Sequence, residues 1–170
     1  APSSQTIHCL HSSHTLIHPS YQHNRFDIRD IPVDENEPDY PPGLDTSIQV
    51  LHDLINEQIS AGIDSRRIFL GGFSQGAVMT LAAGLSFDKP LGGLVVFSGW
   101  ATRRGELNDV IHESNRQTPI LACHGEADPV VSFDLGRKSA ELLASLRMDV
   151  TFRNYRGVGH TACAQVKDTA

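Results

Sequence analysis

Short apolar runs alternate along the chain with segments whose apolar residues recur every three or four positions. The runs at 68–70, 91–97 and 119–123 have the length and composition of buried strands. Helical spacing marks 45–62, 77–85 and 132–147, and a weaker polar helix is expected at 105–116. Strands followed in turn by helices predict an α/β fold.

Local signals set the bounds of the first helix and the last strand. Asp45 or Thr46 can cap the helix that begins there, and Gly62 stands where a C-terminal glycine belongs. Strict alternation of apolar and polar residues over 150–155 predicts a strand near the edge of the sheet. These signals come from residues close together in the sequence, so they predict where a helix or strand lies but not which elements pack against it.

Residues 1–43 show no sustained period and predict an irregular start. Five of the nine histidines lie here, at His8, His11, His14, His18 and His23. Histidines three or four apart can share a helix face and bind zinc or copper. Poor helix propensity and the lack of a carboxylate or cysteine pattern favour a solvated loop without a metal. Prolines at 38–42 extend that loop.

Length, charge and cysteine content bound the function. The 170 residues suit one domain spanning 1–170, and the net charge of −6 argues against nucleic acid or an anionic membrane as partner. Cys9, Cys123 and Cys163 have no framework spacing, so free thiols in the cytoplasm are expected. No apolar run reaches the roughly 18 residues of a membrane span. The chain begins with Ala1, which is consistent with processing or with a piece of something longer.

The run 68–70 leads directly into Gly72-Phe73-Ser74-Gln75-Gly76 and a helix. A Gly-x-Ser-x-Gly turn between a strand and a helix holds its serine in strained geometry, with the hydroxyl exposed at the strand's carboxyl end. The bare pattern is common, but its place between strand and helix favours a nucleophile. We therefore expect Ser74 to be catalytic.

Two further residues complete a candidate triad. Asp128 lies in the turn after the run 119–123, and His160 follows Gly157-Val158-Gly159 after the last strand. The order Ser, Asp, His is that of α/β-hydrolases, in which the histidine is the base and the carboxylate fixes its tautomer. Taken alone, Asp128-Pro129 could equally be a surface turn.

Other residues near these strand ends have plainer interpretations. Cys123 and His124 are expected in the core. Trp100, the single tryptophan, follows the run 91–97. It could line an acyl-binding channel or simply pack in the core, and the sequence supports both equally.

Spaced blocks of this sequence resemble the acyl-protein thioesterase, lysophospholipase and carboxylesterase family. The blocks are 71–77, Phe97-Ser98-Gly99-Trp100, 123–131 and 155–160, and the likeness spans roughly residues 26 to 168. It implies a mostly parallel α/β-hydrolase sheet flanked by helices, the triad Ser74, Asp128 and His160, and no metal or organic cofactor. Phe26-Asp27-Ile28 resembles a Trp-Phe-Asp block in which Arg25 replaces the tryptophan.

The resemblance is incomplete at both ends. Family members open with a strand ending in Leu-His-Gly-x-Gly, which supplies half of the oxyanion hole, while the residue after the serine, here Gln75, supplies the rest. We expect the first strands and the closing helix to be missing, which would leave the neighbour of the run 68–70 open. The alternative is that Leu10-His11-Ser12-Ser13 is a remnant of that block.

The resemblance implies a serine hydrolase of acyl thioesters or carboxylic esters, acting by depalmitoylation, lysophospholipase or carboxylesterase activity. Its substrate would be an acylated protein or a lipid-like ester, with Phe73 and Trp100 contacting the acyl group. The alternative is a truncated homologue that is impaired because one oxyanion donor is absent. A peptidase is disfavoured, since nothing resembles an extra substrate-gating domain.

Overall fold

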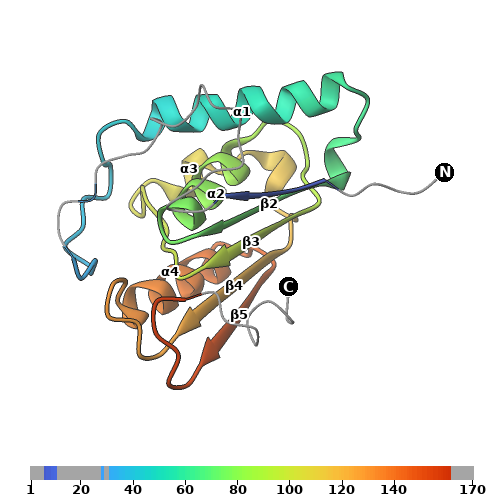
Figure 1. Ribbon diagram of the computed structural model, residues 1–170. Coiled ribbons are helices and arrows are strands. Elements are labelled where there is room, and N and C mark those ends of the chain that lie inside the picture. Colours follow the sequence, from blue (N-terminus) through green and yellow to red (C-terminus); the bar gives the residue numbers. More distant parts are fainter. Residues whose placement is uncertain (1–5, 11–27, 29–30, 162–170) are drawn as a thin grey trace.

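Five parallel strands form the frame of the molecule. A computed structural model describes residues 6–10, 28 and 31–161, and its strands pair in chain order (Figure 1). They are β1 (Thr6–Leu10), β2 (Ile68–Phe73), β3 (Gly93–Phe97), β4 (Ile120–Gly125) and β5 (Val150–Tyr155). The predicted α/β class is confirmed, and β5 lies at an edge of this described sheet.

Helices connect the strands. The longer ones are α1 (Leu44–Ser60), α2 (Gln75–Ser86) and α4 (Phe133–Ser145). The helix expected over 105–116 is reduced to α3 (Leu107–Val110) and the 3₁₀ turn η3 (Glu113–Asn115), and a second 3₁₀ turn, η2 (Ser65–Arg67), precedes β2. Asn115 explains the interruption, because its buried amide binds the backbone of Leu91 and Phe87 instead of facing solvent.

Alternate residues of the strands face the helices. Parallel strands taken in chain order with right-handed crossovers place every connection on the same side of a sheet, as Figure 1 shows. Strand residues on this side pack with α2 and α4 in one core cluster, which includes Ile68, Leu70, Leu94, Val96, Ile120, Leu81, Leu85 and Leu143. The intervening residues Phe69, Val95 and Leu121 are only half-buried.

The two ends of α1 can be compared with the predicted N-cap and C-terminal glycine. Gly62 at φ 95° follows the helix, and its N–H donates to the Ile59 carbonyl, as predicted. The predicted cap by Asp45 or Thr46 is wrong, because Gly43 at φ 84° is the N-cap. The carboxylate of Asp45 instead pairs with Arg103, 58 residues away along the chain. The helix therefore begins at Leu44, one residue before Asp45.

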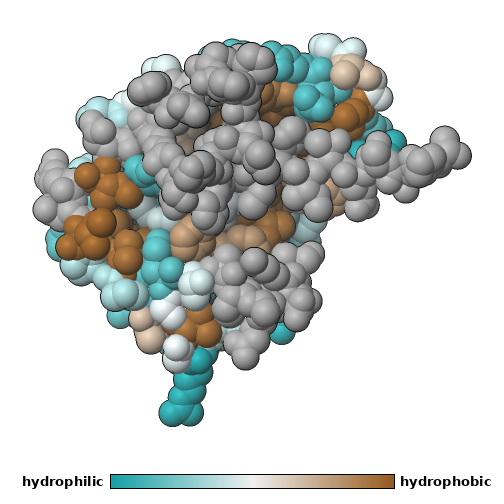
Figure 2. Space-filling view, in the orientation of Figure 1, coloured by the Kyte–Doolittle hydropathy of each residue, from teal (hydrophilic) through white to brown (hydrophobic). Residues whose placement is uncertain are grey.

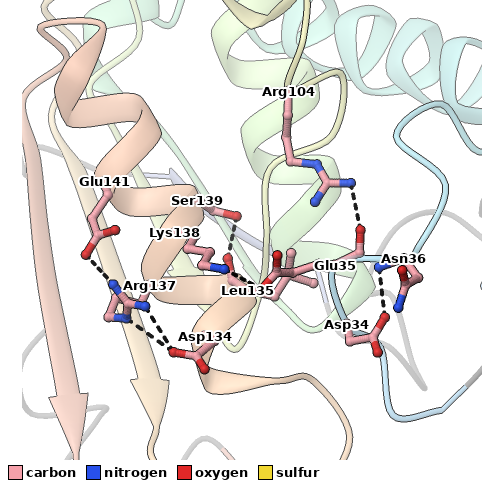
Figure 3. Close-up of polar contacts among 10 residues, drawn as sticks. All are labelled: Asp34, Glu35, Asn36, Arg104, Asp134, Leu135, Arg137, Lys138, Ser139 and Glu141. Atoms are coloured by element: carbon pink, nitrogen blue, oxygen red, sulfur yellow. Dashed lines mark hydrogen bonds and ion pairs between the residues drawn. The ribbon is translucent and has the colours of Figure 1, made fainter.

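The proline-rich segment after residue 31 is a surface loop, as expected, and it is held at several points. Val33 forms a bridge with Val131 and is buried. Lys138 of α4 pairs with Glu35, and the Arg104 guanidinium reaches the backbone of the same loop (Figure 3). Figure 2 shows hydrophobic surface beside this loop. Ile31, at the start of the loop, is 69% exposed.

The start of the chain differs from the sequence expectation. Residues 6–10 are a strand and not part of an irregular loop, and β1 pairs in parallel with β2 from Thr6 opposite Ile68 to Leu10 opposite Gly72. The expectation of an open neighbour beside β2 is therefore wrong. Pairing with β1 gives hydrogen-bond partners to backbone N–H and C=O groups of β2. Each of these groups would cost about 1 to 3 kcal/mol if it were buried without a partner. The expectation that the closing helix is missing falls on residues outside those described.

This strand predicts an effect of deletion. Removing residues 1–10 should lower the midpoint of thermal unfolding, because β2 loses one of its two ladders. Removing only residues 1–5, which precede the strand, is the matched control and should have a smaller effect. Calorimetry of the three chains checks this, and equal midpoints would contradict the pairing of β1 with β2.

Candidate active site

The parallel sheet brings the predicted site residues to one edge. Ser74 follows β2, Asp128 lies beyond the end of β4, and His160 follows β5. Since neighbouring parallel strands end at the same side, all three residues emerge at the carboxyl edge. The loop after β3, which carries Ser98, emerges there too, and the Ser98 N–H donates to the Cys123 carbonyl at 2.8 Å.

Ser74 has the backbone of a sharp strand-to-helix turn. Its φ of 57° and ψ of −123° are strained for a residue with a side chain, and its N–H donates to the Phe97 carbonyl at 2.9 Å. The turn requires glycine at 72, because a Cβ there would lie 2.1 Å from the Gly76 carbonyl oxygen. The hydrogen bond to β3 and the close approach of Gly72 to Gly76 together stabilise the strained conformation of Ser74.

Gln75 is the first residue of α2. Its backbone N–H therefore belongs to the helix N-terminus, where the helix dipole favours negative charge. Ser74, the residue before it, is 7% exposed. A negatively charged oxygen that develops beside Ser74 would thus form near a positive helix end.

The Asp128 carboxylate is held by three donors. Its Oδ1 accepts the backbone N–H groups of Val130 and Val131, each at 2.9 Å, and its Oδ2 lies 2.8 Å from Nδ1 of His160. Burial of Asp128 raises its pKa, but the hydrogen bonds from His160, Val131 and Val130 outweigh burial and set the pKa below its usual value. The carboxylate is therefore ionised near neutral pH.

An ionised partner fixes the tautomer of His160. A carboxylate only accepts, so Nδ1 of His160 carries a proton and Nε2 is left as the base. The imidazole packs on the ring of Phe73, with centroids 4.5 Å apart, beside Ser74 in the chain. Its loop lies close against β4, since a Cβ on Gly125 would lie 2.2 Å from the Val158 carbonyl oxygen.

The remaining residues near the strand ends are buried. Trp100 is 1% exposed in a second core cluster with Val33, Leu44 and Leu135, which favours packing over an acyl channel. Cys123, a free thiol, and His124 are buried as expected. Sequence reasoning missed one contact: Nε2 of His124 lies 3.6 Å from Asp128 Oδ2. Only the His-Gly pair before Asp128 could have hinted at it.

Among residues 28 and 31–161, whose side chains are described, no three His, Cys, Asp or Glu gather into a possible metal site. The histidine-rich stretch from His8 to His23, to which the metal alternative applies, lies outside the residues whose side chains are described. No helix in the described part of the chain has the length and hydropathy needed to span a membrane.

Comparison with solved structures defines the class. Arabidopsis thaliana SOBER1 is 29% identical and superposes with a TM-score of 0.80, over 85% of this chain and 69% of that chain. Zea mays acyl-protein thioesterase 2 is 27% identical with a TM-score of 0.69, over 85% and 68% of the two chains. The fold is that of the α/β-hydrolases.

Residues 6–168 match the family model described as Phospholipase/Carboxylesterase, and the chain belongs to this family. It is 42% identical over 128 residues to acyl-protein thioesterase 1 of Gibberella zeae, covering 74% of this chain and 54% of the relative. A probable carboxylesterase of Oryza sativa subsp. japonica is 36% identical over 149 residues, covering 88% and 54%. The chain thus spans about half the length of these curated relatives.

The low pKa of Asp128 predicts how stability changes with pH. A carboxyl whose folded pKa lies below its unfolded value of about 3.9 stabilises the fold above that pH, and this contribution is lost as pH falls through the folded pKa. Asp128→Asn should therefore lower the free energy of unfolding at pH 7 by about 1 to 3 kcal/mol. The difference from wild type should shrink below about pH 4.

Chemical denaturation at a series of pH values measures this difference. Asp88→Asn is the matched control, because the Asp88 carboxylate is exposed, 3.6 Å from Lys89. A deficit in Asp128→Asn that stays constant from pH 7 to about pH 3 would contradict the ionised, hydrogen-bonded state of Asp128.

Proposed function

We infer that this chain carries the catalytic site of a serine hydrolase of acyl thioesters or carboxylic esters. Ser74 is the nucleophile, His160 the general base and Asp128 the carboxylate that orients the base. The observation that carries the proposal is the 2.8 Å hydrogen bond between His160 and a buried, ionised Asp128. The bond places the proton of the neutral imidazole on Nδ1, so that Nε2 is the nitrogen that can act as the base. The imidazole packs on Phe73, the residue before the strained Ser74.

The reaction proceeds in two half-reactions. Nε2 of His160 takes the hydroxyl proton of Ser74 while Oγ bonds to the substrate carbonyl carbon. The tetrahedral intermediate then expels the thiolate or alkoxide, which receives that proton, and the acyl group remains on Ser74. Water, deprotonated by the same nitrogen, attacks the acyl ester and releases the carboxylic acid and the free serine.

The oxyanion requires donors at the edge of the sheet. The Gln75 N–H at the start of α2 is one. β1 pairs with the elbow strand as far as Leu10 opposite Gly72. The second donor that the family resemblance implies would follow such a strand, and here that position lies outside the described residues.

The substrates are acylated proteins or lipid-like esters. Two relatives bear the names acyl-protein thioesterase and carboxylesterase, which supports both thioester and oxyester cleavage. The net charge of −6 disfavours attraction to anionic membranes or nucleic acid. Phe73 is the aromatic residue that we place at the acyl group, whereas buried Trp100 supports the fold. We place the activity in the cytoplasm, as the free thiol of Cys123 favours.

A serine-reactive fluorophosphonate tests the nucleophile. It should label one residue, Ser74, because only a serine beside a base reacts quickly with this probe. Ser74→Ala should abolish labelling, and His160→Ala should slow it by at least about a hundredfold. Peptide mapping by mass spectrometry measures both outcomes.

Ser86→Ala is the matched control, since Ser86 also lies near a histidine, with Oγ 3.4 Å from Nε2 of His52, at the far end of α2. This variant should label at the wild-type rate. Label at another residue, or undiminished label in His160→Ala, would contradict the triad. Normal labelling without ester turnover would favour the impaired homologue.

A further inference from the structure

The side chain of His124 is tightly packed next to Asp128. It lies near the end of β4 and is 2% exposed. Its ring meets the ring of Phe133 edge-on, with centroids 5.9 Å apart at 80°. A Cβ on Gly136 of α4 would lie 2.2 Å from Nδ1 of His124, so the helix approaches the ring over a glycine. The imidazole is thus confined between the sheet and the first turns of α4.

One polar atom of this ring has two neighbours. Nε2 of His124 lies 3.1 Å from the Val131 carbonyl oxygen and 3.6 Å from Asp128 Oδ2. A carbonyl only accepts, so Nε2 carries the proton and donates it to Val131. Burial lowers the pKa of His124 and outweighs the opposing influence of Val131 and Asp128, while His160 lowers the pKa further. The ring is therefore a neutral donor with a fixed tautomer.

This hydrogen bond closes a loop around the carboxylate. The Val131 N–H donates to Asp128 Oδ1, and the Val131 carbonyl accepts from His124. Val131 is fully buried and bridges to Val33, so the same peptide segment is held on every side. Moving the Val131 carbonyl would move the N–H groups that hold Asp128. The orientation of His160 depends on the same carboxylate.

We propose that His124 is a positioning residue for the triad: its Nε2–H holds the Val131 carbonyl and so fixes the loop that presents Asp128 to His160. The proposal rests on the function inferred above. His124 touches no reacting atom, and its whole effect passes through the placement of the carboxylate. Nε2 of His124 also lies 3.6 Å from Asp128 Oδ2, the oxygen that binds His160.

Two substitutions separate the hydrogen bond from the packing. His124→Leu keeps much of the volume and removes the donor, while His124→Gln keeps an N–H donor at similar reach. With p-nitrophenyl butyrate as substrate, His124→Leu should lower kcat by about tenfold to a hundredfold with KM within about twofold, because the base is misplaced while the acyl contacts remain. His124→Gln should recover most of that loss.

Proton NMR adds a reading that packing alone would not move. The far-downfield resonance of the His160 Nδ1 proton in its bond to Asp128 should broaden or shift in His124→Leu and return in His124→Gln. Folding is checked by circular dichroism. A folded His124→Leu with wild-type kcat and an unmoved resonance would overturn the proposal, as would equal impairment of both variants.

A glycine pair keeps the proposal testable if neither histidine variant folds. Gly136→Ala adds a Cβ that must displace the His124 ring, and it should lower kcat in the same way. Gly105→Ala is its control, because a Cβ there meets nothing within 4 Å. Unchanged kcat in Gly136→Ala overturns the proposal. Absence of turnover in the wild type, or turnover that survives Ser74→Ala, overturns the proposed function and this inference with it.

Discussion

Parallel pairing of all five strands is the constraint on which the rest of the structure depends. It brings the loops after β2, β4 and β5 to one edge, although Ser74, Asp128 and His160 are far apart in the sequence. Because the strands also pair in chain order with right-handed crossovers, the connecting helices lie on one side of the sheet. Each loop then needs only short-range contacts to aim its side chain. The proposed catalytic geometry is a consequence of strand order.

Close backbone contacts refine the placement that the sheet provides. Glycine at 72 lets α2 begin directly after β2, and glycine at 125 lets the His160 loop lie against β4. The Asp128 carboxylate links the loop after β4 to the loop after β5. Two backbone N–H groups of its own loop donate to one oxygen, and His160 binds the other. A buried carboxylate with these donors stays ionised, so the base keeps a single tautomer.

Much of this arrangement could be predicted from the sequence, because its signals are local. Spacing and turn residues predict the helices at 45–62 and 132–147, the elbow at Ser74 and the strand-end positions of Asp128 and His160. β1 could not be predicted, since Thr6-Ile7-His8-Cys9-Leu10 is a short segment among histidines and becomes a strand by pairing with β2. The role we give His124 depends on Val131 and Gly136, which reach it only through the fold.

The central claim is that the sheet edge makes Ser74 an acyl-accepting nucleophile. Rapid-quench mass spectrometry with p-nitrophenyl octanoate measures this directly, because an acylated enzyme accumulates when deacylation is the slower half-reaction. We expect a nitrophenolate burst of one equivalent per chain and one octanoyl group on the peptide that contains Ser74, both absent in His160→Ala. Steady turnover with the octanoyl group on another residue, or an undiminished burst without His160, would contradict the account.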